Sequence, residues 1–214
     1  MGCGTGRLLL EYRANGLDVD GMDVCPEMLA ICKEKASEQS LQVTLYNQTM
    51  ESMAIPRHYQ TIIVPSYTFQ LMPDFGQAES ALNRFFNHLL SGVTLVLSNW
   101  HCKRKGLAEW GDWWLVSEKD GFEDAKSIKH WERSIYDPNT QLRHAESCYE
   151  LFENGEVVYT ELHRRSPELR NYSLSQLTSM LENAGYVQVR AVSENTSDPA
   201  TEEDGTFYII GGRE

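Results

Sequence analysis

The hydrophobic positions along the chain change their period several times between that of a strand and that of a helix. In the first half, strand patterns alternate with helical ones. The strand patterns occupy residues 17–23, 41–46, 61–64 and 94–98. Helical spacing covers residues 26–36 and 78–89, and we expect the second helix to stop at Ser91-Gly92. On the first helix, Met28 falls on the apolar side, so its simplest role is core packing.

The middle of the chain departs from this alternation. Residues 100–121 hold four of the five tryptophans and show weak periodicity. They form either a lid or pocket wall, because aromatic side chains offer apolar area with a polar handle, or a hydrophobic cluster under a long loop. Residues 127–165 then alternate in three runs separated by turns at 137–140 and at Asn154-Gly155. This pattern predicts a meander of antiparallel strands.

The C-terminal part returns to recognisable helix and strand signals. Ser173 and Gln176 have the spacing of a capping box, and the helix that follows should end at Gly185. Residues 186–192 and 206–210 then predict two strands joined by a polar, acidic loop.

Composition changes this picture mainly by exclusion. A length of 214 residues with 41% hydrophobic residues predicts one globular domain. The sequence has no apolar run of eighteen residues and no basic segment followed by an apolar one at its start, so we expect no membrane span and no signal peptide. Its five cysteines form no C-x-x-C pair, which favours free thiols over disulfides or a zinc site. We therefore expect a cytoplasmic protein.

The charge bears on the partner. A formal net charge of −12 disfavours nucleic acid, since phosphate contacts need clustered lysine and arginine. The basic run at residues 103–105 fits a solvated loop better than a binding patch. We expect neither a nucleic-acid partner nor association with a membrane. Assembly into a homodimer is left open.

Candidate chemistry begins with three alternating glycines, Gly2, Gly4 and Gly6, directly before a helical pattern. Glycine adopts positive φ without strain and lets a ligand approach the backbone closely. The helix start behind the loop offers unpaired N–H groups and the positive end of the helix dipole. Asp23 ends a short strand pattern seventeen positions after Gly6. That is close to the spacing of about 20 at which a carboxylate meets a ribose in doubly wound folds.

These two segments, Gly2-Cys3-Gly4-Thr5-Gly6 and the run from Gly21 to Leu29, resemble the class I S-adenosylmethionine (SAM)-dependent methyltransferases. A dehydrogenase fingerprint, G-x-G-x-x-G, is not met, because Arg7 and Leu9 stand where the third glycine would be. The resemblance implies SAM as cofactor, S-adenosylhomocysteine (SAH) as product and no metal. The cofactor residues that it implies are Gly2, Cys3, Gly4, Thr5, Gly6, Asp23, Val24, Thr49, Met50, Pro65 and Ser66.

The resemblance extends over essentially all 214 residues as a single domain. It implies a doubly wound, Rossmann-like α/β sheet, mostly parallel with an antiparallel C-terminal strand, and a small antiparallel β insertion. Within it we expect a cofactor-binding half at 1–100, a lid and β insertion at 101–170, and a C-terminal helix and hairpin at 171–214.

For the substrate, the resemblance points to five residues: Tyr67, Phe69, Gln70, Trp131 and Arg165. Packing of a strand-to-helix loop explains the first three equally well. Arg164 and Arg165, followed by Tyr172, could meet an anionic group, although a solvated edge is the favoured interpretation. His101 and His130 are candidates near the expected mouth of the site, but we assign no general base.

The sequence departs from the family at two points. Thr49 stands about where an aspartate usually contacts the adenine amino group, which puts adenine affinity in doubt. The glycine loop of the family follows a central strand, whereas here Met1 directly precedes Gly2. A parallel sheet without that strand would leave rows of N–H and C=O groups unpaired. We hypothesise a truncated reading frame or a start site assigned too late; the intact mass of the protein from its own source tests this.

The expected function is transfer of a methyl group from SAM to a small-molecule acceptor. Since the sulfonium supplies the electrophile, the protein has mainly to position the two partners and exclude water. The alternative is a truncated or non-catalytic member of the fold that serves as a binding or regulatory module. An RNA or protein methyltransferase is disfavoured by the acidity, and a dinucleotide oxidoreductase by the glycine pattern.

Overall fold

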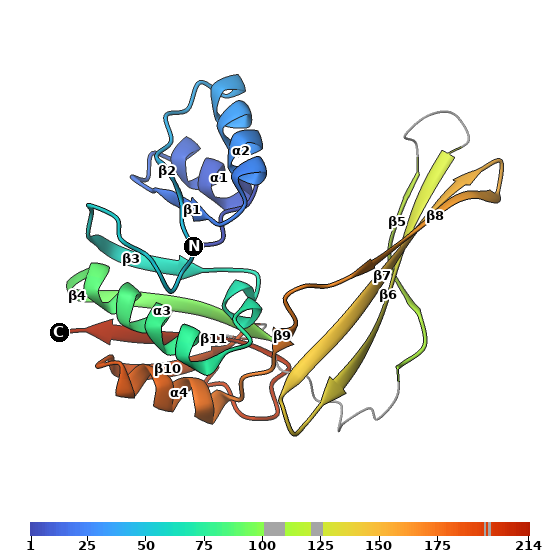
Figure 1. Ribbon diagram of the computed structural model, residues 1–214. Helices are drawn as coiled ribbons and strands as arrows, with labels where there is room; N and C mark the ends of the chain where they lie inside the picture. The colour runs from blue at the N-terminus through green and yellow to red at the C-terminus, as the bar shows by residue number, and fades with distance from the viewer. Residues whose placement is uncertain (101–109, 121–125, 195, 197) are drawn as a thin grey trace. The chain divides into compact units, whose positions relative to one another are not determined.

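A computed structural model describes residues 1–100, 110–120, 126–194, 196 and 198–214. The chain divides into two compact units (Figure 1). The first consists of Met1–Phe69, Asp74–His101 and Tyr172–Glu214, and the second of Gln70–Pro73 and Cys102–Asn171. His101 and the basic run at residues 103–105 lie outside the described ranges.

The N-terminal part of the first unit contains two helices and a two-stranded parallel sheet. Its elements are α1 (Arg7–Ala14), β1 (Gly21–Asp23), α2 (Pro26–Glu38) and β2 (Leu45–Asn47). Leu9 and Leu10 of α1 are buried together with Cys32 and Ala36 of α2. The proline at the start of α2 suits the first helical turn, where its missing N–H has no partner to lose.

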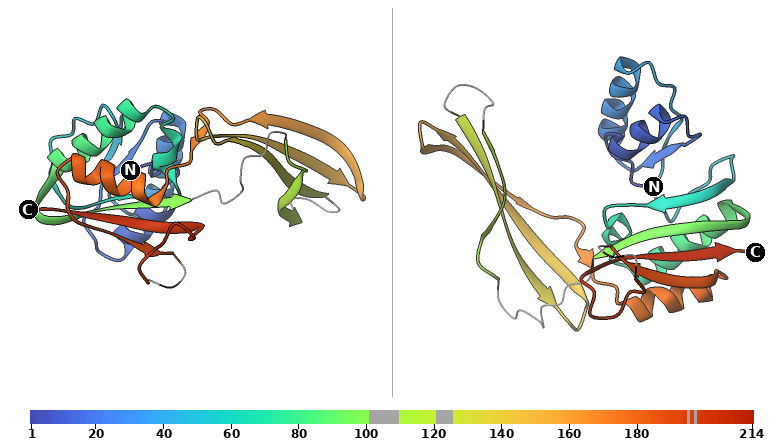
Figure 2. Two further views of the ribbon diagram at one scale, coloured as in Figure 1. Left: turned by 90° about the horizontal axis from the view of Figure 1, so that it is seen from below. Right: turned by 180° about the vertical axis from the view of Figure 1, so that it is seen from behind.

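The rest of the first unit contains a four-stranded sheet in the order β10-β11-β4-β3. Its strands are β3 (Tyr59–Val64), β4 (Leu89–Trp100), β10 (Val187–Ser193) and β11 (Thr206–Arg213). β3 and β4 are parallel, whereas β11 runs antiparallel to both β4 and β10. Helices α3 (Phe75–His88) and α4 (Leu174–Asn183) contact each other and cover one face of this sheet (Figures 1 and 2). Between β3 and α3 lies the 3-10 helix η1 (Thr68–Leu71).

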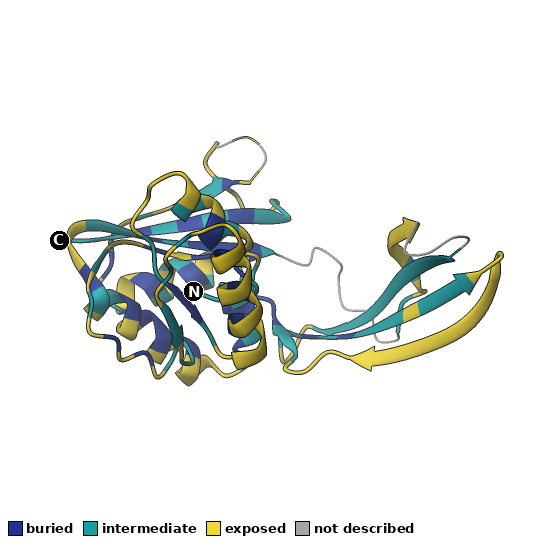
Figure 3. Ribbon diagram, turned by 90° about the horizontal axis from the view of Figure 1, so that it is seen from above, coloured by how far each residue is buried: buried dark blue, intermediate teal, exposed yellow. Residues whose placement is uncertain are grey.

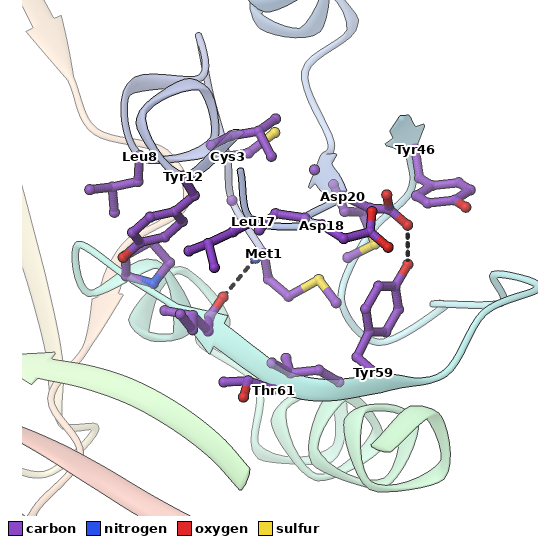
Figure 4. A pocket seen from close by; sticks show the side chains of 18 of the residues that line it. Met1, Cys3, Leu8, Tyr12, Leu17, Asp18, Asp20, Tyr46, Tyr59 and Thr61 are labelled. Carbon is purple, nitrogen blue, oxygen red and sulfur yellow. Dashed lines mark hydrogen bonds between the residues drawn. The ribbon is translucent and has the colours of Figure 1, made fainter. Parts of the chain in front are cut away.

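The α/β fold class with an antiparallel C-terminal strand is confirmed, and the sheet is divided into two pieces. The segment Met1–Cys3 lies between β1 and β3. The Met1 amino group donates a hydrogen bond to the Ile63 carbonyl at 2.7 Å, and the Cys3 N–H donates to the Met22 carbonyl at 3.0 Å. A cavity of about 880 Å³ separates the two strands (Figure 4).

The second unit is an antiparallel sheet in the order β5-β6-β7-β8, with β9 pairing β7. Its strands are β5 (Trp114–Asp120), β6 (Lys126–Asp137), β7 (Leu142–Glu153), β8 (Glu156–Arg164) and β9 (Leu169–Arg170). The Asn154-Gly155 turn joins β7 to β8, and both residues have the positive φ that a tight hairpin needs. The predicted meander is thus confirmed. β8 is exposed along its whole length (Figure 3).

Several predicted boundaries are wrong. β1 begins only at Gly21 and β2 only at Leu45, so both strands are shorter than their patterns. α3 ends at His88, and Leu89 is already extended and pairs with Tyr59 in β4. Ser91-Gly92 therefore does not end the helix but lies in a register shift of β4, where Gly92 has a φ of 76°.

At the C-terminus the local signals are confirmed. Ser173 and Gln176 form the reciprocal capping box at the start of α4. Gly185 follows the helix with a φ of 93°, as expected for the residue that ends it. None of the helices in the described ranges has the length and apolar character needed to cross a membrane.

The ion pairs of Glu146 in the second unit make the stability of the fold depend on pH. The Glu146 carboxylate of β7 accepts hydrogen bonds from Arg164 at 2.7 Å and from Arg133 at 2.6 Å. These bonds, that of Arg164 first, hold the pKa of Glu146 below its ordinary value of 4.5. A depressed carboxylate pKa stabilises the fold above the unfolded-state value, and this contribution is lost as the pH falls through the folded-state value.

We therefore expect Glu146→Gln to lower the free energy of urea unfolding at pH 7, by less than about 1 kcal/mol because the pair is partly exposed. The difference between the variant and the wild type should become smaller at acid pH, as the pH falls through the folded-state pKa of Glu146. A difference that is the same at both pH values would show that packing, not charge, accounts for the effect.

Candidate functional site

The glycine loop has the backbone that the sequence predicts. Gly2, Gly4 and Gly6 all have positive φ, at 63°, 52° and 89°. This left-handed region is costly for residues with a Cβ, which explains why glycine occurs at each position. The loop leads directly into α1, whose first turn begins at Arg7.

The three glycines have different surroundings. A methyl group on Gly2 would lie 2.5 Å from Thr68 Cγ2, and one on Gly6 would lie 2.5 Å from Cys32 Sγ. A methyl group on Gly4 would meet nothing closer than Met28 Sδ at 3.7 Å. Gly2 and Gly6 are therefore required by packing within the protein. Gly4 instead leaves its backbone open to approach by a ligand.

Asp23 lies at the C-terminal end of β1 and fixes this loop. Its Oδ2 accepts a hydrogen bond from the Gly4 N–H at 2.8 Å, and its Oδ1 accepts one from the Cys25 N–H at 3.0 Å. A carboxylate has about four lone-pair sites, so further acceptor capacity remains. The side chain is thus able to hold the loop and to accept bonds from a ligand at the same time.

Asn47, at the end of β2, is a site residue that the sequence analysis did not single out. Its side-chain amide donates to the carbonyls of Asp23 at 3.0 Å and Val24 at 2.9 Å. It therefore secures the backbone on both sides of the Asp23 side chain. The available signal was its place at the carboxyl end of a strand, where ligands of open α/β sheets bind.

Apolar side chains are exposed beside Asp23. Val24 is 63% exposed and Met28 is 46% exposed. The expectation that Met28 packs in the core is therefore wrong. Its helix buries Leu29, Cys32 and Ala36 instead, and Met28 points away from that face toward Gly4.

Thr49 and Met50 follow β2 and are both partly exposed. The Thr49 hydroxyl lies 2.7 Å from the Ser52 hydroxyl, so Thr49 forms part of the turn after the strand. Its carbonyl and remaining lone pair stay able to accept a hydrogen bond, without the charge of an aspartate.

The loop after β3 carries Pro65, Ser66 and Tyr67. Ser66 and Tyr67 both have positive φ, at 54° and 59°. The Thr68 side chain packs against Gly2, so this loop touches the glycine loop directly. Pro65 and Ser66 line the same cavity as Gly2 and Cys3, and their part in cofactor binding stays a prediction.

Three residues of the predicted substrate side are buried. Phe69 is 1% exposed, and its ring packs on Tyr172, which is fully buried. Gln70 is buried as well and donates its amide N–H to the Arg170 carbonyl at 2.9 Å. All three side chains are buried, and their part in substrate binding stays a prediction. Packing, the alternative considered for Phe69 and Gln70, describes their position.

Trp131 and Arg165 belong to the second unit. The Trp131 indole donates to Glu150 at 2.7 Å. Arg165 lies 3.8 Å from a Glu132 oxygen, and Arg164 pairs with Glu146. Their part in substrate binding stays a prediction. The interpretation of residues 100–121 as a lid or pocket wall also stays a prediction, because part of that stretch lies outside the described ranges.

The cavity between β1 and β3 is lined in part by Gly2, Cys3, Pro65 and Ser66, but Gly4, Asp23 and Val24 do not line it. The rest of it is bounded by residues near the start of the strands, such as Asp20 and Tyr59, whose side chains form a hydrogen bond of 2.8 Å (Figure 4). We therefore place the candidate site at the surface formed by Gly4, Asp23 and Val24.

The Cys3 thiol of the glycine loop is a poor nucleophile. Burial raises the pKa of the Cys3 thiol to about 11, so this thiol stays protonated at neutral pH. Within the described ranges, no three His, Cys, Asp or Glu side chains cluster in a way that could hold a metal ion.

A nucleoside-bearing cofactor fits these residues. Gly4 has only the end of the Met28 side chain beside it, the Asp23 carboxylate has acceptor capacity for hydroxyl groups, and Val24 offers an apolar surface. These three features match the requirements of a ribose and a flat base.

Comparison with known proteins agrees with this geometry. Residues 1–92 match a family model described as a methyltransferase domain. A putative methyltransferase of Geobacillus sp. is 21% identical over 211 residues, which cover 98% of this chain and 81% of the relative.

Solved structures show the same fold. A SAM-dependent methyltransferase from Clostridium acetobutylicum is 15% identical with a TM-score of 0.80, over 99% of this chain and 81% of that one. The sugar N-methyltransferase KedS8 from Streptoalloteichus is 17% identical with a TM-score of 0.75, over 100% of this chain and 78% of that one. Residues 1–92 thus match a methyltransferase domain, and the chain shares the fold of these solved methyltransferases.

Proposed function

We propose that this protein binds SAM at Gly4, Asp23 and Val24 and transfers its methyl group to a small-molecule acceptor. The hydrogen bond from the Gly4 N–H to Asp23 carries this proposal, because it fixes an open glycine loop and an acceptor carboxylate in one geometry. Bound SAM supplies an electrophilic methyl group on its sulfonium sulfur.

The protein's own residues have three tasks at this site. Gly4 lets the methionyl end of the cofactor approach the backbone, since it has no Cβ and only the flexible Met28 side chain lies beside it. Asp23 accepts hydrogen bonds from the ribose hydroxyls with the lone pairs that the loop leaves available. Val24 packs against the adenine, and Thr49 offers a neutral acceptor to its amino group.

The small-molecule character of the acceptor rests on charge and on one relative. A net charge of −12 repels nucleic acids. KedS8, which has the same fold, is a sugar N-methyltransferase. A homodimer stays a prediction.

Calorimetric titration of SAM and of SAH into the 214-residue chain tests the proposal. We expect saturable binding of both with dissociation constants of about 1–100 μM, in the usual range for enzyme ligands. NADH serves as the control ligand and should not bind, since the glycine pattern differs from that of dehydrogenases.

A second candidate function is a binding module that has lost cofactor affinity. The neutral Thr49, in place of a charged acceptor for adenine, favours it. A folded chain that binds neither SAM nor SAH would support this function and contradict the first.

A further inference from the structure

Two adjacent residues after β3 hold a backbone that side chains disfavour. Ser66 has a φ of 54° and Tyr67 a φ of 59°. Isolated left-handed residues other than glycine are uncommon, and consecutive ones are rarer still. Such a backbone conformation persists only where several surrounding contacts hold it in place, and it is found most often at functional sites.

Contacts from remote parts of the chain hold Tyr67 in place. Its N–H donates to the Ser98 hydroxyl of β4 at 2.9 Å, and that hydroxyl donates to the Val64 carbonyl at 3.3 Å. Its phenol donates to Glu194, which follows β10, at 3.2 Å. Next to it, Thr68 packs against Gly2 of the glycine loop. Both the backbone and the phenol of Tyr67 are thus fixed, and the next residue along the chain contacts the glycine loop.

Glu194 receives a second phenol. Its other oxygen accepts a hydrogen bond from Tyr208 of β11 at 3.2 Å. Burial, followed by the neighbouring Glu194 charge, raises the pKa of both phenols above the ordinary value of 10, and the Tyr12 phenol adds to the shift of Tyr208. Both hydroxyls therefore stay protonated and donate to Glu194 at neutral pH. The lone pairs of each phenol oxygen remain available to another donor.

The charge of Glu194 is not balanced by a neighbouring cation. Among the lysines, arginines and histidines that the structure describes, none forms an ion pair with this carboxylate. The partners of Glu194 are two neutral hydroxyls, and its side chain is exposed. A ligand with N–H donors and a positive charge is the chemical complement of such a pair.

We propose that Tyr67 and Glu194 form the acceptor side of the active site and select an acceptor with an amino group. This inference rests on the proposed function and names its substrate class. Tyr67 Oη accepts a hydrogen bond from the acceptor nitrogen, and Glu194 is a positioning residue that acts through Tyr67. When the nitrogen gives up its proton, that proton moves to Tyr67 Oη while the Tyr67 proton moves to a Glu194 oxygen, and from there to solvent.

The experiment measures binding, so it does not depend on turnover. Glucosamine is titrated into the full chain with and without SAH and followed by ligand-observed NMR, with glucose as the matched probe that lacks the amine. We expect glucosamine to bind the SAH complex at least about tenfold more tightly than glucose, as for a charge-assisted hydrogen bond.

Three conservative variants identify the residues responsible. Tyr67→Phe and Glu194→Gln should each weaken glucosamine binding by about 10- to 100-fold and leave the SAH affinity and the melting temperature unchanged. Tyr208→Phe is the control, because it loses the same kind of bond to Glu194 but lies outside the strained loop. It should stay within about threefold of the wild type, the ordinary context effect for such a change.

The outcomes separate this inference from the proposed function. If SAH binds but glucosamine binds no better than glucose, the amine selectivity is wrong and the cofactor site stands. Equal losses of glucosamine affinity in Tyr67→Phe and Tyr208→Phe would contradict the proposed role of Tyr67. If SAH fails to bind, the proposed function is wrong, and titration of the free chain still decides whether Tyr67 and Glu194 recognise an amine.

Discussion

Asp23→Ala is expected to weaken SAM binding by about 100-fold or more. The carboxylate accepts bonds from the Gly4 and Cys25 N–H groups, and we assign its remaining acceptor capacity to the ribose. Hydrogen bonds to a charged partner contribute about 1.5–3 kcal/mol each, and every 1.4 kcal/mol is about tenfold in affinity. Removal of this side chain therefore loses the ribose contacts and releases the loop that the cofactor approaches. Calorimetric titration of SAM measures the effect.

Asp18→Ala is the matched control. Asp18 lies five positions earlier, and its side chain is 70% exposed and pairs with Arg13 and Arg57 rather than with the glycine loop. This variant should bind SAM as the wild type does. Asp23→Asn should fall between the wild type and Asp23→Ala, because an amide oxygen can still accept one of the bonds. Wild-type affinity in Asp23→Ala would contradict the ribose assignment.

Gly6→Ala is expected to lower the free energy of unfolding by about 2–5 kcal/mol. Its φ of 89° costs a residue with a Cβ about 1–2 kcal/mol. The added methyl group would lie 2.5 Å from Cys32 Sγ and 3.1 Å from Leu10 Cγ, in the buried contact between α1 and α2. Overpacking of this kind costs about 1–3 kcal/mol more. Urea unfolding followed by circular dichroism measures the change.

Gly16→Ala separates the two contributions. Gly16 has a φ of 79°, but no atom lies within 4 Å of the position that its methyl group would take. This variant should lose only the conformational part, about 1–2 kcal/mol. Equal losses in the two variants would show that the contact with Cys32 relaxes freely and that the backbone conformation alone requires glycine at position 6.

The sequence by itself determined the features that depend on neighbours along the chain. Alternating glycines before a helix pattern predicted a left-handed loop because only glycine tolerates that backbone at every second position. The Asn154-Gly155 turn and the capping box of Ser173 and Gln176 were predicted for similar reasons. Asp23 was found by its spacing from the loop, which βα geometry fixes within one unit.

Burial was less well determined. Met28 has the spacing of a core residue, yet α2 turns its apolar face toward Leu9 and Leu10 and leaves Met28 exposed. Phe69 and Tyr172, considered as site residues, pack on each other although 103 positions separate them. The period of a helix or strand pattern indicates which apolar side chains share a face of the element. Which of them are buried depends on the element that packs against that face.

The tertiary structure alone brought Glu194 to Tyr67. The two residues are 127 positions apart, and Glu194 belongs to an acidic loop that resembles a solvated connection. They meet because β11 inserts antiparallel beside β4, which places the end of β10 near the loop that follows β3. Local sequence encodes turns, caps and periods through short-range sterics. The pairing of remote strands, which decides the partners of a side chain, is set only when the whole sheet assembles.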